Sequence, residues 1–174
     1  MANKEALRDL QNRLAERMLA VRTESPGQSW LAVDCAGMGV LFPLRQAGEI
    51  FDAQGLLPVP HTQSWLAGVA NLRGGLHTVV DLAGFLGLRD LRHGALPENA
   101  RLVAFNASLG LNCALLVDRL EGLRHAADLR REAVDDPQRP AFAVARWVDA
   151  AGRPWQEIAL NELATHDMFL GIAG

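Results

Sequence analysis

The five histidines are the side chains in this sequence that could most readily bind a metal or transfer a proton. They stand alone at His61, His77, His93, His125 and His166, with no second histidine three or four positions away and no cysteine close by. A metal-ligand spacing is therefore absent. Structural roles, on the surface or partly buried, are favoured for all five, and the sequence predicts no metal and no other cofactor.

Candidate nucleophiles also lack the local patterns that mark an active site. Ser29, Ser64 and Ser108 stand in no GxSxG elbow, and no glycine-rich loop with a following lysine is present to cradle phosphates. Cys35 and Cys113 are too few for a zinc set and too far apart for a CxxC pair, and sequence alone does not pair them. Free cysteine is among the most buried residue types, so both are predicted to be small buried hydrophobes. A catalytic triad is assembled in space, so an enzyme remains an open alternative.

Several aspartates follow or end apolar runs, where a carboxylate caps a helix or closes a turn. These are Asp34, Asp81, Asp118 and Asp149. The sequence predicts structural roles for them.

Composition narrows the classes of function further. The net charge is −3, and the lysines and arginines are spread along the chain, so no basic surface for nucleic acid is predicted. No apolar run approaches the ~20 residues of a membrane span, and the N-terminus does not have the pattern of a secretion signal. We therefore expect a cytoplasmic protein with no direct membrane insertion.

The elements that must position these residues are mostly short strands. Residues 3–21 predict an amphipathic helix with an apolar stripe of Leu7, Leu10, Leu14, Met18 and Val21. We expect that stripe to pack on the body of the protein; the alternative is an extra contact for a partner-specific surface. Strands are predicted at 30–35, 38–43, 68–72, 76–80, 101–106, 111–117 and 141–148, and short helices at 62–66, 82–86 and 161–169. Many short strands separated by turns predict a mainly β fold, a sandwich or barrel.

One stretch carries the most specific motif in the chain. Residues 68–74 read Gly-Val-Ala-Asn-Leu-Arg-Gly, and a Val-Val-Asp-Leu sequence with a short helix follows. Asn71 and Gly74 suit a tight turn between two strands, which leaves Arg73 pointing outward. By itself, such an arginine is either a solvated surface charge or an anchor with five N–H donors for a partner's carboxylate or carbonyl.

This stretch closely resembles the signature of CheW-like domains, and nearly everything from Trp30 to Phe169 can be placed on that fold. Within the family it looks most like the PilI type, the adaptors of type IV pilus chemosensory systems. The resemblance implies two SH3-like five-stranded β-barrel subdomains with short helices and a leading amphipathic helix. The expected organisation is an N-terminal helix and turn at 1–27 and one CheW-like domain at 28–172, with subdomains at about 28–92 and 98–172.

The resemblance also implies a function and a site. A protein of this family is a non-enzymatic adaptor that couples the cytoplasmic tip of a methyl-accepting receptor to the regulatory domain of a CheA-type histidine kinase, in receptor arrays at the inner membrane. The output implied by the PilI type is twitching motility. The expected partner-binding residues are Arg73, Asn71, Gly74, Val69 and Leu72, with Leu76 as a further apolar candidate. The alternative for the three apolar residues is a place in the core, and the alternative for Arg73 is a structural latch between the subdomains.

The residues leave some alternatives open. Gly75-Leu76-His77-Thr78 stands where the family usually has a proline before the Val-Val-Asp strand, so we expect Gly75 to widen the turn. The same fold could also serve as an array spacer or decoy that binds only the kinase. In a different class, the chain could be a small β-barrel hydrolase or ligand-binding protein.

Overall fold

The computed structural model describes residues 2–23, 27–90 and 94–172 and, within the first helix, the side chains of residues 5–15. Strands joined by short helices make up most of the chain, which confirms the predicted mainly β fold class. The helices and strands, in chain order, are α1 (Ala2–Thr23), β1 (Ser29–Cys35), β2 (Met38–Pro43), β3 (Ala47–Asp52), β4 (Leu66–Leu72), β5 (Gly75–Asp81), α2 (Leu82–Phe85), β6 (Arg101–Phe105), β7 (Cys113–Val117), β8 (Arg119–His125), β9 (Leu129–Glu132), β10 (Ala143–Asp149), β11 (Pro154–Ile158), α3 (Leu160–Leu163) and α4 (Asp167–Leu170).

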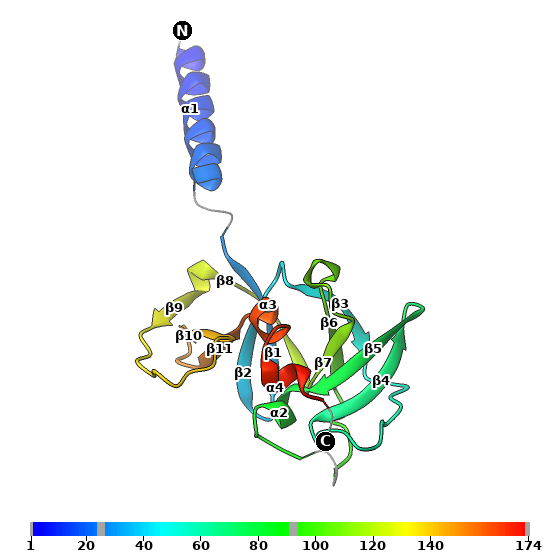
Figure 1. The fold of residues 1–174 in the computed structure, drawn as a ribbon. Coiled ribbons are helices and arrows are strands. Elements are labelled where there is room, and N and C mark those ends of the chain that lie inside the picture. Colours follow the sequence, from blue (N-terminus) through cyan, green and yellow to red (C-terminus); the bar gives the residue numbers. More distant parts are fainter. Residues whose placement is uncertain (1, 24–26, 91–93, 173–174) are drawn as a thin grey trace.

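The strands form two sheets that lie side by side (Figure 1). One has six strands in the order β8-β1-β2-β11-β10-β9, and the other has five in the order β3-β6-β7-β5-β4. In the described chain the edge strands of neither sheet pair with each other, so neither barrel is closed by strand pairing. The two sheets fit SH3-like subdomains, and the first has one strand more than expected.

The sheets do not follow the predicted subdomain bounds of 28–92 and 98–172. Strands β1 and β2, from the first half of the sequence, belong to the six-stranded sheet with β8 to β11. The join is a parallel pairing in which Gln156 lies opposite Val40 and Glu157 opposite Leu41. Conversely, β6 and β7 from the second half complete the five-stranded sheet. Strand pairing between distant segments, and not chain order, decides which strands share a sheet.

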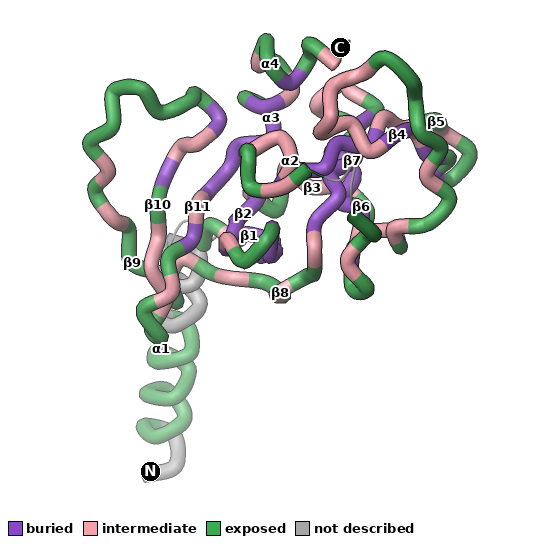
Figure 2. Tube along the Cα trace, turned by 90° about the horizontal axis from the view of Figure 1, so that it is seen from below, coloured by how far each residue is buried: buried purple, intermediate pink, exposed green. Residues whose placement is uncertain are grey.

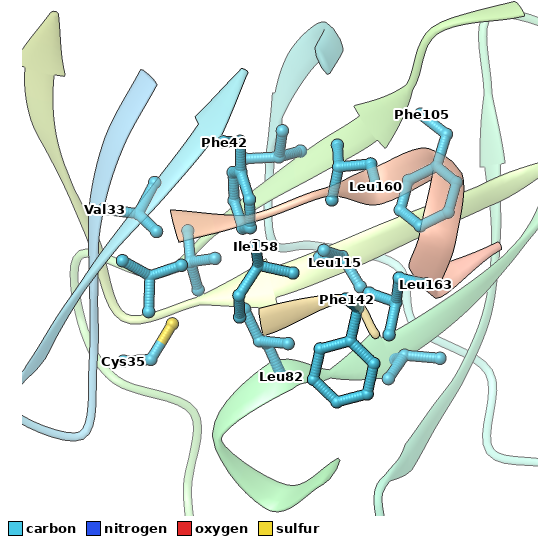
Figure 3. Close-up of a cluster of buried hydrophobic side chains, with 14 of the residues drawn as sticks. Val33, Cys35, Phe42, Leu82, Phe105, Leu115, Phe142, Ile158, Leu160 and Leu163 are labelled. Carbon is cyan, nitrogen blue, oxygen red and sulfur yellow. The ribbon is translucent and has the colours of Figure 1, made fainter. Parts of the chain in front are cut away.

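Buried residues lie along strands of both sheets (Figure 2). Their side chains form one shared core and two smaller ones. Along β1, Leu31, Val33 and Cys35 point into the shared core, while Trp30 and Ala32 point to the opposite face, as alternation along a strand requires. The shared core lies between the two sheets and includes Val33, Cys35, Phe42, Leu82, Phe105, Leu115, Phe142, Ile158, Leu160 and Leu163 (Figure 3). Each sheet therefore has its own small core, and the shared core joins the two into one body.

Four strands and two helices differ from the sequence prediction. Strands β3, β8, β9 and β11 were not predicted, and all but β11 are edge strands with mostly exposed or half-buried residues. The predicted helix at 62–66 is absent from the described chain. The backbone of this segment instead forms hydrogen bonds with residues distant in sequence. The Gln63 N–H donates to the Ile172 carbonyl, and the Trp65 carbonyl accepts from the Asp81 N–H. The predicted helix at 161–169 is divided into α3 and α4.

The leading helix is present, but its apolar stripe is exposed where it is described. Leu7, Leu10 and Leu14 are between 53% and 59% exposed, and α1 stands clear of the sheets in Figure 1. The expectation that this stripe packs on the body is wrong for these leucines. Met18 and Val21 lie outside the described side chains. No helix in the described part of the chain is long and apolar enough to cross a membrane.

Both cysteines are buried and free, as predicted. Burial is the main reason that the pKa of Cys113 rises to about 12 and that of Cys35 lies well above its ordinary value. The thiolate is the reactive form, so both thiols should be inert in the folded protein. We expect Ellman's reagent at pH 8 to find no reactive thiol in the native protein and two after unfolding in guanidinium. Rapid reaction of either thiol in the native state would contradict their burial.

Candidate partner-binding site

The predicted turn is the tight connection between β4 and β5. Leu72 pairs with Gly75 across the hairpin, so only Arg73 and Gly74 form the loop. Both have positive φ, 50° for Arg73 and 78° for Gly74, which is the pattern of a type I′ turn. Asn71 stabilises it because its Oδ1 accepts the Gly74 N–H at 2.9 Å. The hairpin confirms the turn that the motif predicted.

The missing proline does not widen this turn. The strand register runs without a shift from Leu72 and Gly75 to Val69 and Thr78. His77 Nδ1 lies 3.0 Å from the Gly75 carbonyl, a contact that supports the start of β5 from within the strand. The expectation that Gly75 would open the loop is wrong, because the turn geometry is fixed by Arg73 and Gly74 ahead of it.

Arg73 is presented at the tip of the hairpin. Its side chain is 75% exposed, and its Nε lies 2.7 Å from Oε2 of Glu49, which is 52% exposed. Glu49 is on β3, the edge strand at the other side of the same sheet. The five-stranded sheet therefore curls until its two edges are joined by this ion pair. Because both side chains are exposed, the pair contributes at most about 1 kcal/mol of stability.

The apolar site candidates divide between the two faces of the hairpin. Leu72 is only 7% exposed and packs with Ala70 and Val79 in the small core of the five-stranded sheet. It therefore supports the hairpin from inside and is not available for direct contact. Val69 is half-buried, and Leu76 is 64% exposed. The outward face of the hairpin thus presents Val69 and Leu76 beside the Arg73 turn.

Gly68, the first residue of the motif, has a structural role that the sequence did not reveal. Its φ is +140°, and a Cβ there would lie 2.3 Å from the carbonyl oxygen of Leu57. Leu57 and Val69 exchange two backbone hydrogen bonds, each 2.9 Å long, alongside β4. Only glycine lets the chain approach β4 this closely. The segment around Leu57 therefore covers part of an otherwise open sheet edge.

Sequence reasoning also missed a partly buried ion bridge at the junction of the two sheets. Asp81 caps α2 by accepting the Gly84 N–H, as predicted, but it also binds Arg89 through hydrogen bonds of 3.1 and 2.7 Å. The same guanidinium lies 2.6 Å from Asp118, whose other oxygen accepts the Ala36 N–H in the β1–β2 turn. Burial lowers the pKa of Arg89, but the hydrogen bond and charge of Asp81, followed by the charge of Asp118, raise it overall.

Two arrangements bear on the enzymatic alternative. Ser29 Oγ lies 3.0 Å from His125 Nδ1 beside a pocket of about 290 Å³, but the hydroxyl also donates to the Gly27 carbonyl. Among the described residues no carboxylate hydrogen-bonds to His125, so this pair is not a triad. In the same part of the chain no group of three or more histidine, cysteine or acidic residues could hold a metal ion.

Comparison with known proteins identifies the class that this two-sheet fold and its exposed hairpin represent. The model of the CheW-like domain family matches residues 29–167. The chain belongs to the CheW-like domain family, and it is a coupling protein of that class.

A particular relative and a solved structure support this assignment. Protein PilI of Pseudomonas aeruginosa is 30% identical over 151 residues, which cover 84% of this chain and 82% of PilI. The crystal structure of the scaffolding protein TtCheW from Thermoanaerobacter tengcongensis matches with a TM-score of 0.63 at 16% identity. That match covers 76% of this chain and 84% of TtCheW, and it shows the shared fold.

Proposed function

We propose that this protein couples the cytoplasmic tips of methyl-accepting receptors to the regulatory domain of a CheA-type histidine kinase. It acts without catalysis, in the cytoplasm, as part of receptor arrays at the inner membrane. The output is control of type IV pilus twitching motility. The observation that carries this proposal is the similarity to PilI over 84% of the chain, together with the family match from residue 29 to residue 167.

The β4–β5 hairpin is the proposed contact region. Arg73 supplies N–H donors that can form a bidentate pair of hydrogen bonds with a carboxylate or carbonyl of the partner. Asn71 and Gly74 hold the turn that presents it. Val69 and Leu76 add apolar surface next to the charge, and such a mixed patch suits a transient signalling contact that buries less than ~1,200 Å².

We expect Arg73→Glu to weaken binding to both receptor and kinase at least about tenfold, since a well-placed interface arginine contributes 2 kcal/mol or more. The fold should survive, because the Arg73–Glu49 pair is exposed. Binding is measured by surface plasmon resonance with the kinase regulatory domain and with a receptor-tip fragment. The matched control is Glu49→Gln, which breaks the same ion pair but keeps the guanidinium. Equal weakening by both variants would make Arg73 a latch of the sheet instead of a contact.

The coupling role itself is tested by co-sedimentation. Receptor-containing membranes are mixed with the kinase, with and without this protein, and the kinase in the pellet is measured. Coupling predicts that kinase enrichment requires the protein. Binding of kinase without receptor would instead identify an array spacer or decoy, and binding of neither would reject the adaptor function.

A further inference from the structure

The two sheets repeat one arrangement of five strands. The orders β3-β6-β7-β5-β4 and β8-β1-β2-β11-β10 match strand for strand, and in each the third and fourth strands pair parallel. In each half the fourth strand leads into a short helix, α2 after β5 and α3 after β11. Thr78 therefore corresponds to Gln156, because each lies four residues before the first residue of that helix and each takes part in the parallel pairing.

The C-terminal segment of the chain fills one of two equivalent places. In the first half, Thr78 lies beside Phe169 and Leu170 of α4, around a cavity of only about 80 Å³. In the second half the corresponding residue, Gln156, lines a pocket of about 300 Å³. The walls of this β10–β11 pocket come from the β1–β2 hairpin and the β10–β11 hairpin. Within the described chain, no helix lines the second place as α4 lines the first.

Two arginines line the β10–β11 pocket, and none of its described lining residues is acidic. Arg153 is held in place, because its guanidinium lies over the Trp155 ring, 4.4 Å from the centroid, and 2.8 Å from Asp34. Arg146 is exposed and forms no hydrogen bond or ion pair with a described residue, although Glu132 lies opposite it on β9. The wall of the pocket therefore has one positive charge that is free to bind a carboxylate.

The surroundings of the pocket favour an acidic protein segment over a polyanion. Asp34 and Glu121 both bind Arg153, and they would repel the row of phosphates that a nucleic acid or an anionic membrane presents. A single carboxylate on Arg146 avoids this repulsion. Met38 and Pro154 add apolar walls, and about 300 Å³ is the lower limit for a small-molecule site. One apolar side chain next to a carboxylate fits this space.

We propose that the β10–β11 pocket binds a short helical segment of a partner protein, in which a carboxylate stands beside an apolar side chain. Arg146 donates a bidentate pair of hydrogen bonds to the carboxylate, and the apolar side chain packs on Met38 and Pro154. The segment 161–172 of this chain is of that kind, since it carries Glu162 and Asp167 next to the apolar residues of α3 and α4.

This pocket is separate from the contact region of the proposed coupling function. The β10–β11 hairpin belongs to the six-stranded sheet and the Arg73 hairpin to the five-stranded sheet, and the two lie on opposite sides of the molecule (Figure 1). One molecule can therefore bind a segment at the pocket and a partner at Arg73 at the same time. The pocket is tested without receptor or kinase, so its failure and that of the coupling function are distinguishable.

A peptide with the sequence of residues 161–172 and blocked ends is the probe, and ¹H–¹⁵N NMR titration of the full chain is the measurement. We expect saturable shifts of the amide signals of Gly37, Gly39 and Gln156, which line the pocket. Arg146→Glu should raise the dissociation constant at least about tenfold. The control Arg131→Glu makes the same charge change at an exposed position of β9 and should bind like wild type. Absence of these shifts, or unchanged binding by Arg146→Glu, overturns the proposal.

A charge exchange tests the pairing of the carboxylate with Arg146. A peptide with Glu162→Gln and Asp167→Asn should bind the wild-type protein at least about tenfold more weakly, but the two peptides should bind the Arg146→Gln protein alike. The same loss on both proteins contradicts the pairing. Shifts confined to Thr78 and its neighbours would mean that the peptide displaces α4, and free glutamate that competes as well as the peptide would make this a site for a small carboxylate. Either result overturns the proposal.

Discussion

Arg89→Ala is expected to lower the free energy of unfolding by about 3–5 kcal/mol, which is the cost of removing one partner from a buried ion pair. Asp81 is completely buried, and two of its hydrogen bonds come from Arg89. Without the guanidinium its carboxylate keeps the Gly84 N–H but has no cation. The same change breaks the link to Asp118 and so to the β1–β2 turn. The measurement is urea unfolding followed by tryptophan fluorescence.

A matched control separates this effect from the loss of any arginine. Arg131 lies exposed on β9, and Arg131→Ala should change stability by no more than about 0.5 kcal/mol. If Arg89→Ala is as mild as Arg131→Ala, the ion bridge does not stabilise the junction of the sheets. The double variant Arg89→Ala with Asp81→Asn should recover part of the loss, because it no longer leaves a buried carboxylate without a cation.

The hairpin was predictable because its determinants are neighbours in sequence. Asn71 accepts the N–H of Gly74 three residues later, and positive φ at Arg73 and Gly74 follows from the turn that connects two short strands. Gly75 does not open the loop, although the family's proline is missing, because the two residues before it, Arg73 and Gly74, already close the turn. Local chemistry therefore predicted the turn and its outward Arg73, although it did not show which apolar side chains of the hairpin are exposed.

Leu72 and Leu76 show why the sequence could not predict which side chains of the hairpin are buried and which are exposed. Both are apolar residues in the same motif, but Leu72 is buried and Leu76 is exposed. Which face of a half-exposed hairpin turns inward depends on what packs below it, here Leu102 and Ala104 of β6 and Leu116 of β7. The sequence of the hairpin alone does not predict that packing, because the partners lie on other strands.

The sheet order and the ion bridge were not predictable for a related reason. Pairing of β2 with β11 joins residues 40 and 156, and Arg89 connects Asp81, at the end of β5, with Asp118, which lies between β7 and β8. The pattern of apolar residues within a short stretch of sequence does not predict contacts between segments so far apart. The edge strands β8 and β9 lacked a clear alternation of buried and exposed residues, so only pairing with their neighbours defines them.

Phe169→Ala should lower the free energy of unfolding by about 3–5 kcal/mol, the usual cost of removing a buried phenylalanine. Phe169 is the buried residue of α4, and its ring lies 5.5 Å from that of Phe85 and 5.9 Å from that of Phe105. These rings belong to the core shared by both sheets. Removing the ring leaves a cavity there, and the thermal midpoint should fall by roughly 10 °C.

The neighbouring residue provides the control for this prediction. Met168 is 66% exposed, and Met168→Ala should leave stability within about 0.5 kcal/mol of wild type. Differential scanning calorimetry of both variants gives the comparison. A large loss only in Phe169→Ala means that the C-terminal helix unfolds together with the two sheets. A loss below about 1 kcal/mol would mean that α4 separates from the body before the sheets unfold, because a locally unfolding segment does not contribute to global stability.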